Sequence, residues 1–354
     1  MINYEEALNI ITSKLSGVSK TKQMALLDSV KHICAKDIYA TTSLPTHAIS
    51  LKDGIAFLAN DKYEVSTGDI LKEGTLAVVP DEESMQNPPN MYNIKEAGED
   101  IQKGELLLSK GELITAYGIT SLASQGIKKL SVFRKPKVSI LSIGDNLCPV
   151  QKDIKKGEVY NSNALSLGAR ILEIGAKIAK VWQVVNEKEA IKEHLRELAK
   201  YSDFIITTGA MSRHDAMNKA LGDSEFSLLF HKVQIAPAMP TAFSIFEETP
   251  ILHLTGLPLS SLLGFELLGI ASIKIIKNES LGDRKSIHVK NQNEFTCRDG
   301  CTSAIPGFFN GVSFKSAPTF GAGMLNVLSK CNGYALIKDQ TIIKEDELVE
   351  FFSF

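Results

Sequence analysis

Three short apolar runs, each ending in glycine, do most to limit the folds open to this chain. They are VSILSI before Gly144, FIITT before Gly209 and ILHLT before Gly256. A short unbroken apolar run is typical of a strand that is buried on both faces, as in a parallel sheet. Stretches with helical apolar spacing, such as 163–172 with Asn163 as its N-cap, lie between the runs. This alternation predicts an α/β domain with a parallel sheet and right-handed crossovers.

The rest of the chain predicts further domains around this one. Helical spacing at 3–16 and near 23–35 favours a helical N-terminal part, whereas Pro-rich turns after residue 44 favour short strands. Alternating runs separated by turn residues indicate an all-β tail. The predicted division is a helical and linker domain at 1–44 and 94–133, an inserted β-rich lobe at 45–93, an α/β domain at 134–278, and a C-terminal β domain at 279–354.

Composition and charge exclude several classes of function. The net charge of −2 over 354 residues gives no basic surplus for binding nucleic acid. The apolar stretch 257–276 is interrupted by Ser, Gly, Glu and Lys, so we expect a buried core helix rather than a membrane span. The start of the chain lacks the pattern of a signal peptide, and its five cysteines are an odd number. We therefore expect a cytoplasmic protein that binds neither membranes nor nucleic acid.

The glycines at the strand ends indicate where a ligand could bind. In an open parallel sheet, ligands lie at the carboxyl ends of the strands, where the strand order reverses. Glycine there lets backbone N–H groups approach an anion, and the following helix N-terminus favours negative charge. A single glycine could simply end a strand, but Gly144, Gly209 and Gly256 together predict a ligand cleft.

Several short motifs follow the order of motifs in a known family. They read SLKDGIA at 50–56, KEAGED at 95–100, SIGD at 142–145, VYNSN at 159–163, FHKV at 230–233 and FGAGML at 320–325. With them, the chain resembles the molybdopterin molybdenumtransferases, which include bacterial MoeA and the E domain of gephyrin. The resemblance spans nearly the whole chain. It implies an α/β multidomain fold whose central parallel-sheet domain resembles a molybdopterin-binding domain.

The resemblance also implies an activity, a metal and partners. Molybdate would be inserted into adenylylated molybdopterin with release of AMP, assisted by a divalent metal such as Mg²⁺. Asp53, Asp145 and Asp215 would be catalytic, and Asp145 and Asp215 would hold the metal. The lobe with Asp53 would reach the cleft of a partner subunit, which implies a homodimer. A molybdopterin adenylyltransferase or proteins of molybdoenzyme assembly are further expected partners.

The substrate contacts implied by the resemblance come from loops and strand ends. They are Thr67, Gly144, Ser162, Gly209, Ser212, Arg213, Lys232, Gly256 and Pro258. Several of the candidate catalytic and substrate-binding residues also have plain structural interpretations. Asp53 could belong to a hairpin turn, Asp145 could cap a helix, Lys232 could be a surface residue, and 213–215 could be a solvated loop.

The chain departs from the family pattern where an anion would be bound. The family sequence K-P-G-K-P reads APAMP at 236–240, so Ala236 and Met239 stand where the family has lysine. Ala210 replaces a glycine, and LSS at 259–261 replaces G-N-P. Losing two cations near an anion costs about 2 kcal/mol, or about thirtyfold in affinity. We hypothesise that Arg213 and His214 partly replace this charge.

Three functions are compatible with these departures. One is a divergent molybdenumtransferase. Another is a catalytically impaired paralogue that acts as a dimeric scaffold, binding molybdopterin or a cofactor-assembly partner. A third is an enzyme acting on a different phosphorylated ligand.

Overall fold

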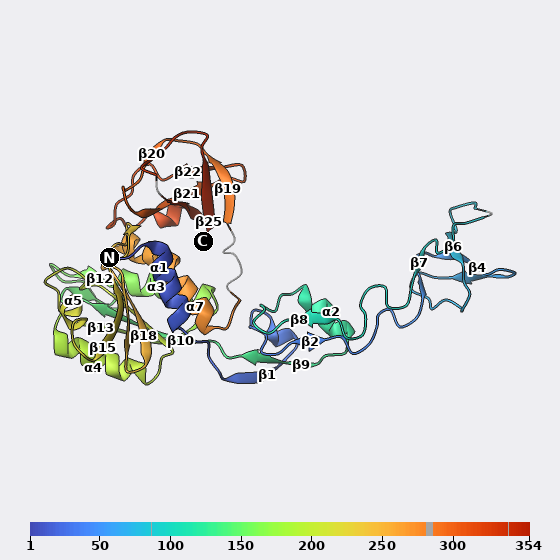
Figure 1. Cartoon of the computed structure of the whole chain (residues 1–354), viewed down its shortest axis with the longest axis horizontal. Coiled ribbons are helices and arrows are strands. Elements are labelled where there is room, and N and C mark those ends of the chain that lie inside the picture. Colours follow the sequence, from blue (N-terminus) through green and yellow to red (C-terminus); the bar gives the residue numbers. More distant parts are fainter. Residues whose placement is uncertain (86, 281–285, 339) are drawn as a thin grey trace. The chain divides into compact units, whose positions relative to one another are not determined.

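A computed structural model describes residues 1–85, 87–280, 286–338 and 340–354. These residues form two compact units, one of residues 21–132 and one of residues 1–20 with 133–354. Figure 1 labels many of the elements of each unit.

The unit of residues 21–132 is mostly β-structure. Its elements are β1 (Thr21–Ala25), a 3₁₀ turn η1 (Leu27–Ser29), β2 (Ile38–Tyr39), β3 (Ile49–Ser50), β4 (Gly54–Phe57), β5 (Lys62–Val65), β6 (Ala77–Pro80), β7 (Ile94–Lys95), β8 (Leu106–Leu108), α2 (Gly118–Ser124) and β9 (Lys129–Phe133). The prediction of a helical N-terminal domain is therefore wrong. The stretch 23–35 is not a helix, because Thr21–Ala25 pairs with β9, about a hundred residues further along the chain. Tertiary pairing of this kind overrides local helical spacing.

The second unit is built on a six-stranded sheet with the order β13-β10-β14-β18-β17-β15. Its strands are β10 (Lys137–Ile143), β13 (Lys177–Val184), β14 (Phe204–Thr208), β15 (Phe226–His231), β17 (Ala242–Phe246) and β18 (Thr249–Leu254). The first four strands in this order are parallel, but β17 runs antiparallel to both of its neighbours. The sheet is therefore mixed, and the prediction of a parallel sheet holds only for those four strands.

Helices cover both faces of this sheet. Leu141 and Ile143 of β10 pack in one cluster with Ile191 and Leu195 of α4 (Lys188–Ala199) and with Met217 of α5 (Ala216–Ala220). On the opposite face, α3 (Ser162–Glu173) brings Gly168 against Ile140, with 3.7 Å between the side chain and an ideal Cβ position. The alternation of side chains along β10 thus directs neighbouring residues to different helices.

A long apolar helical stretch runs through α6 (Pro258–Gly264), a π-helical turn η2 (Phe265–Gly269) and α7 (Ile270–Ile276). It is long and apolar enough to cross a membrane, but 78% of its apolar window is buried inside the fold. The prediction of a buried core helix is confirmed. Its Glu266, which is 5% exposed, accepts hydrogen bonds from Arg170 of α3 at 2.7 and 3.3 Å. The N-terminal helix α1 (Tyr4–Lys14) belongs to this unit too, and Tyr4 donates to the Leu267 carbonyl.

The C-terminal residues form a small all-β domain, as predicted. Its strands are β19 (Ser286–Asn291), β20 (Phe295–Thr296), β21 (Thr302–Phe309), β22 (Ser313–Ser316), β23 (Gly333–Ile337), β24 (Ile342–Ile343) and β25 (Leu348–Ser353), with a 3₁₀ turn η3 (Leu328–Lys330). Strand pairing runs from β21 through β22, β19, β25 and β23 and returns to β21, so five strands close a barrel. The two-residue strand β16 (Ile235–Ala236), which leaves the central domain, pairs with β21.

Candidate functional site

A hollow of about 610 Å³ opens at the carboxyl ends of β10, β14 and β18. The chain passes from β13, on one side of β10, to β14 on the other, so the strand order reverses at this point. This is where open α/β sheets bind ligands. Residues lining the hollow include Ser142 and Ile143 of β10, Thr208 at the end of β14, and Gly256 after β18.

The polar groups of the hollow are mostly neutral. Asn161 caps α3, its Oδ1 accepting from the Ala164 N–H at 3.4 Å and from the Ser142 hydroxyl at 3.0 Å. Asn163 donates to the Thr208 hydroxyl at 3.1 Å and to the Gly256 carbonyl at 2.9 Å. The prediction that Asn163 is the N-cap of this helix is therefore wrong. Its amide instead ties the first turn of α3 to the ends of two neighbouring strands.

The predicted substrate residues Ser162, Gly209, Gly256 and Pro258 all line the hollow. Gly209 has a φ of +100°, and a Cβ there would lie 2.2 Å from the carbonyl oxygen of Ile143. A Cβ on Gly256 would lie 3.3 Å from the Cα of Gly209. The backbones of the neighbouring strand ends therefore approach more closely than side chains would allow.

The predicted metal ligands Asp145 and Asp215 meet at one residue that sequence reasoning missed. The backbone N–H of Asn186 donates to Asp145 Oδ1 at 2.8 Å, and its side-chain amide donates to Asp215 Oδ1 at 2.9 Å. Asn186 Oδ1 also accepts from the N–H of Ala216 at the start of α5. Neither carboxylate is among the residues lining the hollow. Within the described residues, no group of three or more His, Cys, Asp or Glu side chains converges as a metal site.

Other predicted residues lie on loops outside the lining of the hollow. Ser212 and Arg213 are exposed on the loop after β14, where the Ser212 N–H donates to Asp215 Oδ2 at 2.8 Å. Lys232 follows β15 with a φ of 68°, is exposed, and accepts at its carbonyl from the Ile2 N–H. Gly144 directly follows β10 and donates its N–H to the Val184 carbonyl. Ala210 has a φ of 56°, so this position keeps a glycine-like conformation without glycine.

Asp53 and Thr67 meet each other in the unit of residues 21–132. Asp53 Oδ1 accepts from the Thr67 N–H at 2.6 Å. This hydrogen bond lowers the pKa of the exposed Asp53 carboxyl, because it stabilises the ionised form. The interaction joins the turn before β4 to the turn after β5.

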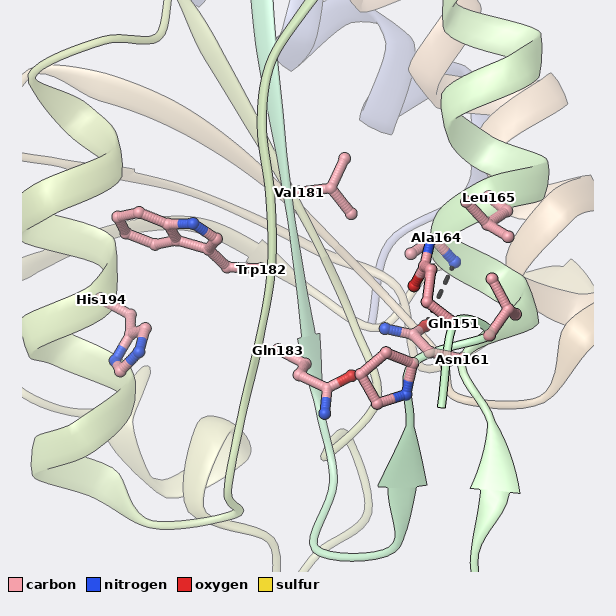
Figure 2. A pocket seen from close by; sticks show the side chains of 10 residues that line it. Gln151, Asn161, Ala164, Leu165, Val181, Trp182, Gln183 and His194 are labelled. Atoms are coloured by element: carbon pink, nitrogen blue, oxygen red, sulfur yellow. Dashed lines mark hydrogen bonds between the residues drawn. The ribbon is translucent and has the colours of Figure 1, made fainter. Parts of the chain in front are cut away.

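A second hollow of about 550 Å³ lies along β13, the edge strand of the sheet (Figure 2). Figure 2 shows Val181 and Trp182 pointing to opposite sides of β13, with Trp182 toward His194 of α4. The rings of Trp182 and His194 pack edge to face with 5.8 Å between their centroids. Asn161 lines this hollow as well as the larger one, so the segment before α3 separates the two.

Sequence reasoning could have found part of what it missed. Asn186 lies between the strand β13 and the helix α4, which is a normal place for a polar capping residue. The segment VYNSN holds two asparagines and a serine before a helix, and only the structure shows that Asn161 is the cap.

Two family models match separate parts of the chain. A family model described as "MoeA N-terminal region (domain I and II)" matches residues 2–126. One described as "Probable molybdopterin binding domain" matches residues 139–274, the part of the chain that contains the six-stranded sheet and the strand ends around the larger hollow.

Similar proteins and structures cover most of the chain. The molybdopterin molybdenumtransferase of Bacillus subtilis is 30% identical over 298 residues, covering 70% of this chain and 69% of the relative. That of Haemophilus influenzae is 25% identical, covering 75% of each. The crystal structure of the molybdopterin biosynthesis moeA protein from Pyrococcus horikoshii OT3 superposes with a TM-score of 0.86 at 21% identity, over 100% of both chains. At this identity, the superposition shows the shared fold.

Proposed function

The chain belongs to the MoeA family of molybdenum cofactor biosynthesis, and from this we propose that it inserts molybdate into adenylylated molybdopterin with release of AMP. The observation that carries the proposal is the hollow where the strand order reverses, lined by the ends of three parallel strands and the start of α3. Its volume of about 610 Å³ lies within the usual range for small-molecule sites.

The residues of the hollow can orient the substrate by hydrogen bonds. Backbone N–H groups at the first turn of α3 favour an anion, because the start of a helix carries partial positive charge. Ser162 lines the hollow and offers a hydroxyl there, whereas the Thr208 hydroxyl already donates to the Thr255 carbonyl and accepts from Asn163. The molybdopterin would thus be held at the strand ends, with the adenylyl link directed toward the loops after β10 and β14.

Asp145 and Asp215 are the residues that would hold a divalent metal. Mg²⁺ is usually held by one or two carboxylates together with substrate phosphates and water, so two carboxylates joined through Asn186 fit such an ion. The bound metal would neutralise charge on the link that is cleaved. Asn186 would keep both carboxylates oriented, and Asp53 would complete the site from a partner subunit in a homodimer.

One observation favours a second function, a molybdopterin-binding scaffold with impaired catalysis. No lysine or arginine stands among the residues that line the hollow in the described chain. Transfer of an oxyanion normally uses cations that stabilise the developing charge. A site without them could keep binding the pterin while losing turnover.

Incubation of the purified protein with adenylylated molybdopterin, molybdate and Mg²⁺ separates the two functions. The transferase should release AMP, measured by chromatography, with the Bacillus subtilis enzyme as positive control. Tight binding of molybdopterin without AMP release would instead establish the scaffold. If the protein neither binds molybdopterin nor releases AMP, both functions are contradicted.

Substitution of Asn163 tests whether the hollow is the binding site. In Asn163→Ala the strand ends lose two hydrogen bonds, so we expect molybdopterin to bind about tenfold more weakly and the protein to be destabilised by about 1–2 kcal/mol. Titration calorimetry and urea unfolding measure the two effects. Ser166→Ala, on the exposed side of α3, is the matched control. Unchanged affinity in Asn163→Ala would argue against this hollow.

A further inference from the structure

The loop 149–158, between β11 (Leu147–Cys148) and β12 (Val159–Tyr160), walls both hollows and carries three lysines. Ile154 and Glu158 of this loop line the larger hollow, while Pro149, Val150 and Gln151 line the second one. The lysines are Lys152, Lys155 and Lys156, all exposed. Among the described ion pairs, none involves these three ammonium groups.

The backbone of the loop is fixed although its lysine side chains are free. Lys152 N–H donates to the Pro149 carbonyl at 3.0 Å, and Glu158 N–H donates to the Lys155 carbonyl at 3.1 Å. The pairing of β11 with β12 closes the base of the loop. The buried Cys148 thiol points at carbonyls of the same loop, and its burial raises the pKa of the thiol. The lysines are therefore held beside the hollow while their ammonium groups can move.

The charge inside the hollow is of the wrong sign for an anion. Among the described residues that line it, Glu158 is the one Asp, Glu, Lys, Arg or His side chain, and its carboxylate accepts from the Lys155 N–H at 2.8 Å. A phosphorylated ligand would therefore meet a negative charge and no cation on the walls. Arg213 and His214 do not change this, because they lie on the loop after β14 and not in the lining.

We propose that Lys152, Lys155 and Lys156 form the anion-binding rim of this hollow and hold the phosphate end of its pterin ligand. The inference rests on the proposed function, because it takes molybdopterin as that ligand. Lysine suits this role, since a compact charge on a flexible stem can reach a phosphate from the rim. The rim supplies from one loop the positive charge that the walls lack, because its three lysines outnumber the two carboxylates of the loop, Asp153 and Glu158.

The proposal predicts that removing the lysine charges weakens binding of the ligand, whereas removing the Glu158 charge strengthens it. A charge pair about 8 Å apart in water changes binding by about twofold, so removing three such cations weakens binding by about tenfold. Removing the charge of Glu158 should tighten binding by about twofold to threefold. Salt screens exposed charges, so both effects should shrink between about 50 mM and about 300 mM NaCl.

The test is the dissociation constant of molybdopterin, measured anaerobically by calorimetry at both salt concentrations. The variants are the triple change Lys152→Gln, Lys155→Gln and Lys156→Gln, and the single change Glu158→Gln. A control of equal charge change replaces three exposed barrel lysines, Lys290, Lys315 and Lys344, by glutamine. Since all three loop lysines are exposed, the triple variant should fold normally, which thermal unfolding checks.

The expected result is about tenfold weaker binding in the loop variant at low salt, tighter binding in Glu158→Gln, and no change in the barrel control. The rim is overturned if the loop variant binds as the wild type does while the wild type binds molybdopterin. If the wild type binds no molybdopterin at all, the proposed function fails, and the rim fails with it. Equal losses in the loop and barrel variants would also overturn the rim, because they would reflect net charge alone.

Discussion

Replacing Gly209 by alanine is expected to abolish molybdopterin binding and to lower the free energy of unfolding by about 3–4 kcal/mol. The residue has a φ of +100°, where a side chain is strained, and its Cβ would lie 2.2 Å from the Ile143 carbonyl oxygen. That oxygen belongs to the end of β10, so relief of the clash must separate β10 from β14. The floor of the hollow would then open. Urea unfolding and titration calorimetry measure the two losses.

Gly311→Ala is the matched control, because it separates the clash from the backbone strain. Gly311 has a φ of +95°, but no atom lies within 4 Å of the Cβ position. We expect a loss of only about 1 kcal/mol there, with binding retained. Equal destabilisation by the two substitutions would show that close strand packing at Gly209 is not the cause.

The second large effect is a loss of stability in acid that depends on His253. This residue of β18 is fully buried, and burial lowers the pKa of its imidazole from 6.5 to about 3. One ring nitrogen meets the Thr207 hydroxyl at 2.9 Å and the other meets the Ser244 hydroxyl at 2.8 Å. A neutral imidazole, with one donor and one acceptor, is satisfied by two hydroxyls, whereas the charged form would be desolvated.

The sign of the effect follows from the lowered pKa. The unfolded chain takes up the proton near pH 6.5 and the folded chain only near pH 3, so the contribution to stability is complete above pH 6.5. It falls by about 1.4 kcal/mol per pH unit below that, which amounts to about 3 kcal/mol at about pH 4.5 and about 5 kcal/mol in total.

Urea unfolding of the wild type and of His253→Gln at about pH 7, 5.5 and 4.5 tests this expectation. Carboxylates contribute to both proteins alike, so the difference between their pH dependences isolates the histidine. The wild type should lose about 3 kcal/mol more than the variant between the highest and lowest of these pH values. Parallel curves would mean that the folded protein protonates this imidazole as readily as the unfolded chain does.

The sequence predicted the elements whose burial leaves a clear pattern. Unbroken apolar runs identified β10, β14 and β18, since strands covered on both faces have no polar alternation. It did not predict β17 or the direction of that strand. The hairpin between β17 and β18 turns at Glu247 and Glu248, with φ values of 46° and 64°. Such turns usually contain glycine or asparagine, so two glutamates gave no signal.

The candidate site was predicted only in part, because some of its features leave a pattern in the sequence and others do not. Glycines at strand ends are visible in a sequence, and Gly209 and Gly256 do line the hollow. The hydrogen bonds of Asn163 and Asn186 join residues far apart in the chain, and no local pattern reports them. The roles of Asp53, Asp145 and Asp215 stay predictions from the family resemblance.

The backbone bonds around the short strand β16 give a physical reason why the run 236–240 keeps both prolines of the family sequence K-P-G-K-P and neither of its lysines. This strand pairs with the barrel strand β21, while the Val233 N–H donates to the carbonyl of Met239 in the run and the Lys232 N–H donates to the carbonyl of Thr241 directly after it. The Pro237 carbonyl also accepts from the Ser260 hydroxyl at 2.7 Å. The backbone of this run is therefore bonded to both the central domain and the barrel. Its prolines shape that backbone, whereas lysines that contacted only a ligand could be replaced without loss of these backbone bonds.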